Sequence, residues 1–273
     1  GTPGRMTAPP PTQFARMAWR GQPVRIEYAW VGSGHAHAPA MVFLHEGLGS
    51  VAMWRGFPAP VSEKLGMRGL VFSRPGYGRS TPRAPDEHWA NDFMHRQADE
   101  VLPAFLSAVG VAQPPWLFGH SDGASIALLH ARNHPAAGVI ALAPHTMVEP
   151  LSVDSIAKAR AAYLHDGLRE RLARYHDDVD SAFWGWNDVW LSPAFGAWDI
   201  RQELGTIGCP VLAIQGLQDE YGTLAHVRGI ADQVPQARVV ELDHCGHSPH
   251  RDQPAAVIEA CGAFVQEHPF SNH

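Results

Sequence analysis

The chain has 273 residues, of which 45% are hydrophobic and 18% are charged. This balance is typical of a soluble globular protein. The sequence contains no run of 18 or more apolar residues, so it predicts no membrane-spanning helix. With 21 basic against 27 acidic residues the net charge is -6, which argues against nucleic acid or an anionic membrane as a partner. The length favours one domain that carries an insertion.

The cysteines and the start of the chain bear on its compartment. Cys209, Cys245 and Cys261 are odd in number and lack CxxC spacing, so they indicate neither a disulfide framework nor a structural zinc site. The start lacks a basic segment followed by an apolar one, and we expect Gly1–Arg5, which precede Met6, to be an expression remnant. We therefore expect a cytoplasmic protein, either a monomer or a homodimer.

Short apolar runs recur along the chain, each bounded by Gly or Pro and followed by a helix-compatible segment. The expected strands are Met41–Leu44, Gly69–Phe72, Trp116–Phe118, Gly138–Ala143, Val211–Ile214 and Arg238–Leu242. The expected helices are Asp92–Val109, Ser121–Asn133, Thr223–Val234 and Pro254–Val265. This alternation predicts an α/β fold with a mostly parallel, doubly wound sheet, in which ligands bind beyond the carboxyl ends of the strands.

One stretch breaks the alternation. Residues 146–205 contain no apolar strand run and are compatible with helices, so we expect a helical cap there, with 1–145 and 206–273 forming the core. The stretch holds Trp184, Trp186, Trp190 and Trp198. This is more aromatic surface than a plain connection requires, and Trp184, Trp186 and Trp190 are candidates for contacting an apolar or aromatic part of a substrate.

A candidate nucleophile follows the third of these expected strands. Gly119-His120-Ser121-Asp122-Gly123 is a G-x-S-x-G sequence between an expected strand and an expected helix. A sharp turn there leaves room only for glycine beside the serine, and the hydroxyl lies at a helix N-terminus that favours an anion. Ser121 is therefore the candidate nucleophile; the alternative is an ordinary serine that caps the helix.

A serine hydroxyl needs a base within hydrogen-bond reach, and the base needs a carboxylate that orients it. Asp219 follows the run Val211–Ile214, and His247 lies in the loop after the last run. Glu220 adjoins Asp219, but the GxxD spacing from Gly216 favours Asp219.

We expect neither a metal nor a cofactor. His244 and His250 flank His247 at three-residue spacing, but no paired acidic ligand completes a metal site.

Further motifs resemble those of the α/β-hydrolases of the serine esterase or lipase type, and the likeness covers nearly the whole chain. Leu44-His45-Glu46-Gly47-Leu48-Gly49-Ser50 resembles the HGxxG-type oxyanion loop. Ser73-Arg74-Pro75-Gly76-Tyr77-Gly78-Arg79-Ser80 resembles the DxxGxGxS segment, and Gly246-His247-Ser248-Pro249 resembles the GHxP segment that holds the catalytic histidine. Four motifs in the family's order, including the serine turn, make the resemblance specific.

The resemblance implies the α/β-hydrolase fold, with the helical cap inserted after the sixth strand. The implied catalytic triad is Ser121, Asp219 and His247. The implied oxyanion donors are the backbone N–H groups of Asp122 and Gly47, with that of Leu48 as the next choice.

Two residues depart from the family's pattern. Glu46 stands where the family usually has glycine, and Ser73 replaces the usual aspartate. A carboxylate beside an oxyanion hole would oppose the developing negative charge unless it is paired, protonated or turned away. We expect Arg74 or Arg79 to neutralise Glu46.

Several side chains are candidates for lining the substrate pocket. The resemblance of the serine turn to GxSDG-bearing relatives that hydrolyse α-amino acid esters implies that Asp122 binds an ammonium group; the alternative is a helix N-terminal aspartate that favours the dipole. Four more candidates are Glu46, Trp54, His120 and His145. Trp54 and His145 fit an ordinary packed core position equally well.

We therefore expect a serine hydrolase that cleaves a small or medium carboxylic ester through an acyl-enzyme intermediate. Alternatives on the same triad are hydrolysis of a carbon-carbon bond in a ring-cleavage product, or cleavage of an α-amino acid ester or N-terminal residue. An alternative of another class is a non-catalytic small-molecule receptor on the same fold.

Overall fold

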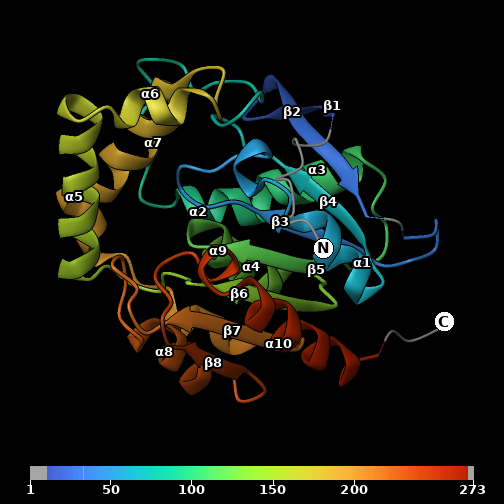
Figure 1. Cartoon of the computed structure of the whole chain (residues 1–273). Helices are drawn as coiled ribbons and strands as arrows, with labels where there is room; N and C mark the ends of the chain where they lie inside the picture. The colour runs from blue at the N-terminus through green and yellow to red at the C-terminus, as the bar shows by residue number, and fades with distance from the viewer. Residues whose placement is uncertain (1–10, 33, 270–273) are drawn as a thin grey trace, which may run out of the picture.

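The computed structural model describes residues 11–32 and 34–269; the expected remnant Gly1–Arg5 lies outside them. One sheet runs in the order β1-β2-β4-β3-β5-β6-β7-β8 (Figure 1). Its strands are β1 (Gln13–Trp19), β2 (Gln22–Val31), β3 (Ala40–Leu44), β4 (Arg68–Phe72), β5 (Trp116–His120), β6 (Gly138–Leu142), β7 (Val211–Gly216) and β8 (Arg238–Leu242). From β4 to β8 along this order the pairs are parallel, which confirms the predicted α/β fold.

The six expected strands coincide with β3 to β8, but β1 and β2 were not expected. These two strands form an antiparallel hairpin at the sheet edge, and β2 also pairs antiparallel with β4. Exposed and buried residues are mixed along both strands. An edge hairpin with one solvated face lacks the continuous apolar run of a buried parallel strand, and for this reason the sequence did not reveal it.

Helices cover both faces of the sheet. One face carries α1 (Pro58–Leu65) and α10 (Pro254–Gln266). The other carries α2 (Phe93–Arg96), α3 (Leu102–Ala108), α4 (Asp122–Asn133) and α8 (Ala225–Gln233). Since successive side chains of a strand point to opposite faces, Met41 and Phe43 of β3 pack on the first face and Val42 and Leu44 on the second.

A π-helical turn, η2 (Gln97–Val101), joins α2 to α3, so the single helix expected over 92–109 is divided.

Three helices follow β6 and stand together beside the sheet (Figure 1). They are α5 (Pro150–His165), α6 (Leu168–Ala173) and α7 (Val179–Leu191), followed by the 3-10 turns η3 (Pro193–Ala197) and η4 (Arg201–Thr206). The rings of Tyr163 and Phe183 stack between α5 and α7. At the start of this insertion, the Glu149 carboxylate accepts hydrogen bonds from His226 Nε2 at 2.6 Å and from the Thr223 amide at 2.9 Å. The insertion is thus fixed to the loop that follows β7.

No helix among the described residues is both long and apolar enough to span a membrane.

Two glycines allow α4 to pack directly on the sheet. A Cβ added at Gly123 would lie 2.1 Å from the carbonyl oxygen of Leu44, and one at Gly119 would lie 2.4 Å from the carbonyl oxygen of Gly123. Both obstacles are backbone atoms, which cannot rotate aside as a flexible side chain can. The start of α4 therefore lies against the end of β3 only because these positions lack side chains.

We predict that Gly123→Ala lowers the free energy of unfolding by about 1–3 kcal/mol, because the new methyl group forces α4 away from β3. Urea unfolding with a fitted midpoint and slope measures this change. Gly196→Ala is the matched control: a Cβ there meets nothing within 4 Å, so its effect should stay within about 0.5 kcal/mol. Equal effects of the two substitutions would contradict the packing argument.

Candidate active site

Ser121, His247 and Asp219 form a hydrogen-bonded relay at the carboxyl edge of the sheet. Ser121 Oγ lies 2.9 Å from His247 Nε2. His247 Nδ1 lies 2.9 and 3.0 Å from the two carboxylate oxygens of Asp219. All three residues are buried, and Ser121 is only 5% exposed. Residues more than a hundred positions apart in sequence are thus joined into one chain of hydrogen bonds.

The backbone holds Ser121 in a sparsely populated conformation. Its φ of 56° and ψ of -120° fit neither a strand nor a helix, and such strain persists only where the surroundings fix it. The Ser121 amide donates to the Leu142 carbonyl at 2.9 Å, while its own carbonyl accepts from the Ala124 amide at 2.9 Å. β6 and the first turn of α4 therefore fix the turn from both sides.

The loop after β7 fixes the carboxylate of Asp219. One oxygen accepts from the Tyr221 amide at 2.8 Å, and the other accepts from Gln215 Nε2 at 3.2 Å. Burial raises the pKa of Asp219, but the hydrogen bond and charge of His247 and these two donors hold it below its usual value. Asp219 is therefore ionised at neutral pH. The carboxylate of the neighbouring Glu220 takes no part in the relay.

His247 is a base that remains able to accept a proton despite its burial. Burial lowers its pKa, but the hydrogen bond and charge of Asp219 outweigh this and raise the pKa above the usual value of 6.5. The ring of Tyr221 packs at 4.8 Å from the imidazole, and those of His120 and His145 at 5.3 and 5.6 Å. These contacts fix the plane of the imidazole.

The loop after β3 lies beside the relay. The carboxylate of Asp122 and the indole of Trp186 both pack on Gly47, where an added Cβ would lie 2.3 Å from Trp186 Cδ1 and 3.1 Å from Asp122 Oδ2. Within the described residues, the backbone N–H groups of Gly47, Leu48 and Asp122 have no backbone or side-chain acceptor. These are the donors that the sequence proposed for an oxyanion, and they are available for one.

The expected pairing of Glu46 with an arginine is wrong. The Arg74 guanidinium donates to the main-chain carbonyls of His45 and Glu46, and Arg79 makes its contacts elsewhere, its amide bonding to Glu27. The Glu46 carboxylate instead lies 3.7 Å from His120 Nδ1 and is 24% exposed. Solvent and a neighbouring imidazole, not an arginine, therefore surround this charge.

Asp122 carries a buried carboxylate that contacts the insertion. Its Oδ2 accepts from Trp190 Nε1 at 3.2 Å. Burial raises the pKa of Asp122 to about 6, although the charge of Arg74 and the Trp190 hydrogen bond act in the opposite direction. An ammonium group at this carboxylate would have to compete with the indole N–H and with a nearby guanidinium.

Four of the other proposed pocket residues lie next to the relay or to Gly47. His145 and Trp190 pack ring to ring at 4.9 Å beside His247, and Trp186 covers Gly47. His120 lies behind the relay, with Nε2 2.7 Å from the carbonyl oxygen of His247.

Trp54 and Trp184 lie elsewhere. Trp54 packs in the core against Phe43 and Phe118, and the contacts of Trp184 are with Tyr163 and Phe183 inside the insertion.

Two residues that shape the site, Gln215 and Tyr221, were not identified from the sequence, and Arg74 was expected in another role. Gln215 and Tyr221 hold Asp219, and Arg74 holds the loop after β3. The position of Tyr221, two residues after the acid, is the one available signal, since an aspartate often binds the amide two residues on. Nothing in a single sequence distinguishes the buried Arg74 from the exposed Arg79.

Comparisons with known proteins show the family and the fold of the chain. A model of the alpha/beta hydrolase family matches residues 41–260. The chain is 42% identical to rhodomycin D methylesterase DauP of Streptomyces sp. (strain C5) over 66 residues, which cover 24% of this chain and 21% of that protein. It is 22% identical to the pimeloyl-(acyl-carrier protein) methyl ester esterase of Aromatoleum aromaticum over 84% of this chain and 97% of that protein. A carboxylesterase structure from Nitrososphaera gargenis superposes with a TM-score of 0.75 at 15% identity, over 92% and 98% of the two chains, and shows the shared fold.

The relay predicts the pH dependence of any reaction that uses His247 as a base. Such a base must be neutral, so kcat/KM should fall as the pH drops through the raised His247 pKa. Asp219→Asn removes the interactions that raise this pKa and leaves the burial that lowers it. We therefore expect the acid limb of the profile to move to lower pH while kcat falls by about 10⁴.

Asp243→Asn is the matched control for this profile, since it removes the same charge from a side chain that is 60% exposed. Its acid limb should stay in place. If the acid limb of the kcat/KM profile did not move in Asp219→Asn, a group other than His247 would control it.

Proposed function

We propose that this chain, which belongs to the alpha/beta hydrolase family, is a serine hydrolase that cleaves a small or medium carboxylic ester through an acyl-enzyme intermediate. The observation that carries the proposal is the relay, with Ser121 Oγ 2.9 Å from His247 Nε2 and His247 Nδ1 2.9 Å from Asp219. This is the geometry that a serine needs in order to lose its proton while it attacks a carbonyl carbon.

In the acylation step, His247 Nε2 takes the proton of Ser121 as Oγ attacks the ester carbonyl. The Asp219 carboxylate holds the proton on Nδ1 and stabilises the imidazolium that forms. The N–H groups of Asp122 and Gly47, which have no acceptor among the described residues, stabilise the carbonyl oxygen as it becomes negative. The imidazolium then protonates the leaving alcohol, and the acyl group remains on Ser121.

Deacylation repeats these steps with water. His247 takes a proton from the attacking water, the same N–H groups hold the second tetrahedral oxyanion, and Ser121 recovers its proton as the acid leaves. The burial of the relay supports this route, since fixed dipoles act more strongly where water is excluded.

The substrate side of the proposal comes from the insertion. Trp186 and Trp190 of α7 lie over Gly47 and Asp122, so an apolar or aromatic part of an ester would contact indole rings next to the reacting carbonyl. Two of the relatives are a methylesterase and a methyl ester esterase, which is consistent with an ester as the bond cleaved.

The alternatives on the same relay have less support. Recognition of an α-amino ester by Asp122 has to share the carboxylate with the Trp190 indole N–H and to overcome the positive charge of Arg74. No feature of the site selects a carbon-carbon bond. A purely binding role leaves the strained Ser121 turn and the relay without a use.

Turnover of p-nitrophenyl acetate and butyrate tests the hydrolase. Ser121→Ala and His247→Ala should each lower kcat by at least about 10³, because each removes one member of a unit that acts together. Ser107→Ala, at an exposed position of α3, is the matched control and should keep full activity. Retention of wild-type turnover by Ser121→Ala would identify the protein as something other than a serine hydrolase.

A second experiment addresses Asp122. We expect an α-amino acid p-nitrophenyl ester and its deaminated analogue to give kcat/KM values within about threefold of each other, since the positive charge of Arg74 and the Trp190 hydrogen bond already act on the Asp122 carboxylate. The ratio should not change in Asp122→Asn. A strong preference for the amino ester that Asp122→Asn abolishes would instead assign an ammonium-binding role to this carboxylate.

A further inference from the structure

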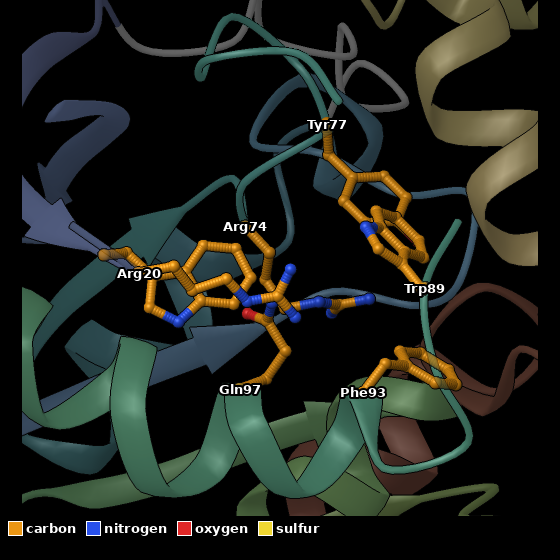
Figure 2. Close-up of a pocket in the computed structure, with 7 residues that line it drawn as sticks. Arg20, Arg74, Tyr77, Trp89, Phe93 and Gln97 are labelled. Atoms are coloured by element: carbon orange, nitrogen blue, oxygen red, sulfur yellow. The ribbon is translucent and has the colours of Figure 1, made fainter. Parts of the chain in front are cut away.

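A small cavity lies beside Arg74, whose guanidinium bonds to the loop that carries Gly47. It is ≈10 Å³ in volume, about the space of one water. Figure 2 shows Arg74, from the loop after β4, and Gln97, from η2, reaching toward the same space, with Tyr77 and Trp89 next to each other at one side. Nothing in the proposed reaction uses this cavity.

Arg74 places a buried positive charge on the wall of the cavity. The residue is 2% exposed. Its two terminal nitrogens donate to the main-chain carbonyls of His45 and Glu46, and within the described residues no carboxylate oxygen lies within 4.0 Å of the guanidinium. Buried charges are costly unless they are paired, and two carbonyls use only two of the five N–H donors.

The cavity wall also holds polar atoms that lack partners. The Tyr77 hydroxyl, Gln97 Oε1 and the indole nitrogen of Trp19 are buried without a hydrogen bond. Burial raises the pKa of Tyr77 above its usual range, so the phenol stays a neutral donor. Unpartnered buried polar groups are rare in folded proteins. Here three of them line one cavity with the Arg74 guanidinium, which stacks over the Tyr77 ring at 4.9 Å and has no carboxylate within 4.0 Å among the described residues. Two of the three are donors.

The cavity can be enlarged at its rim. Arg20 forms part of the wall, and its side chain is 33% exposed and pairs with Glu87 at 2.9 Å. An ion pair that is about a third exposed contributes little free energy, and Arg20 also stacks on the Trp19 ring at 4.3 Å. A carboxylate is larger than the space of one water, so its entry requires Arg20 to give up both contacts and turn toward solvent. The flat rings of Trp89 and Phe93 bound the remaining side.

The cavity is also coupled to the proposed oxyanion site. Arg74 bonds to the carbonyls of the two residues that precede Gly47. Its charge acts on Asp122, whose carboxylate touches Gly47. An anion bound at Arg74 would therefore act on a guanidinium that bonds to the Glu46 carbonyl, and this carbonyl belongs to the same peptide group as the Gly47 N–H.

We propose that this cavity is a carboxylate-binding subsite, in which Arg74 pairs with a compact carboxylate and the Tyr77 hydroxyl donates a further hydrogen bond. A planar carboxylate matches the fork of a guanidinium. The carboxylate is either a free small ion or a second, unesterified carboxylate of the substrate. If the carboxylate belongs to the substrate, the substrate is a half-ester of a dicarboxylic acid. Only this second source rests on the proposed esterase function.

Binding of formate to Ser121→Ala protein tests the subsite without any turnover. The unfolding temperature Tm is measured at increasing concentrations of sodium formate and, in parallel, of sodium pivalate, with the ionic strength held constant. Pivalate carries the same charge on a group that is too bulky for the cavity. We expect formate to raise Tm with saturation and pivalate to leave it unchanged. Equal shifts with both anions, or no shift with either, would overturn the proposal.

Variants locate the binding. Arg74→Gln should weaken formate binding at least about tenfold, because it removes the charged donor. Arg79→Gln removes the same charge from an exposed neighbour and should bind as the parent protein does. Because Arg74 also holds the loop before Gly47, Tyr77→Phe serves as the milder variant: it deletes only the hydroxyl and should weaken binding about threefold or more. Unchanged formate binding in both pocket variants would place the anion elsewhere and refute the subsite.

Kinetics with monomethyl and dimethyl succinate then identify the source of the carboxylate. A higher kcat/KM for the half-ester that Arg74→Gln abolishes and Arg79→Gln retains assigns the carboxylate to the substrate. No such preference, with formate binding intact, assigns it to a free ion. If no ester is hydrolysed although formate binds, the proposed function fails and the subsite stands.

Discussion

The site depends on the close approach of α4 to β3. A backbone carbonyl lies where the side chain of residue 123 would begin, so the chain can leave β5, turn at Ser121 and enter α4 at this angle only with glycine there. The approach brings the amide of Asp122 next to the loop that begins at the end of β3. Gly47, in the loop after β3, and Asp122, at the start of α4, thus lie next to each other, and these are the two residues whose N–H groups we propose as oxyanion donors.

Burial then decides which of the many histidines can act as a base. The chain has 17 histidines. Burial lowers the pKa of His120 to about 4 and holds those of His145 and His250 well below the usual range, so all three stay neutral near the relay. His247 is equally buried, but Asp219 restores its affinity for a proton. Neutral neighbours do not compete for that proton, and their rings fix the orientation of the imidazole.

The sequence predicted the parts of this arrangement that depend on local pattern. Apolar runs predicted β3 to β8, and the glycines around Ser121 predicted the strained turn, because in each case neighbouring residues carry the physical cause. The edge hairpin β1 and β2 escaped detection since its half-exposed strands mix polar and apolar residues.

The sequence pattern did not predict which residues the long side chains contact. The Arg74 guanidinium bonds to main-chain carbonyls, and the partly exposed Glu46 carboxylate lies near the buried His120. Tertiary packing, and not the residues next to them in sequence, decides these contacts. Of the tryptophans in the insertion, Trp186 and Trp190 face the site, whereas Trp184 packs inside the insertion; helical spacing alone did not separate them.

The insertion is not independent of the core, so in the proposed reaction a substrate that contacts it would also act on the loop that carries Gly47. His176 bridges two loops of the core, since its Nδ1 accepts from the Gly78 amide at 2.9 Å and its Nε2 donates to the Leu48 carbonyl at 2.8 Å. Trp186 and Trp190 press on Gly47 and Asp122 from the same side. A substrate that displaces these indoles therefore pushes on the same loop that would hold the oxyanion. In a close-packed interior such displacements are transmitted to the neighbouring residues, so changes in α7 that alter the substrate contact will also alter the position of the N–H donors.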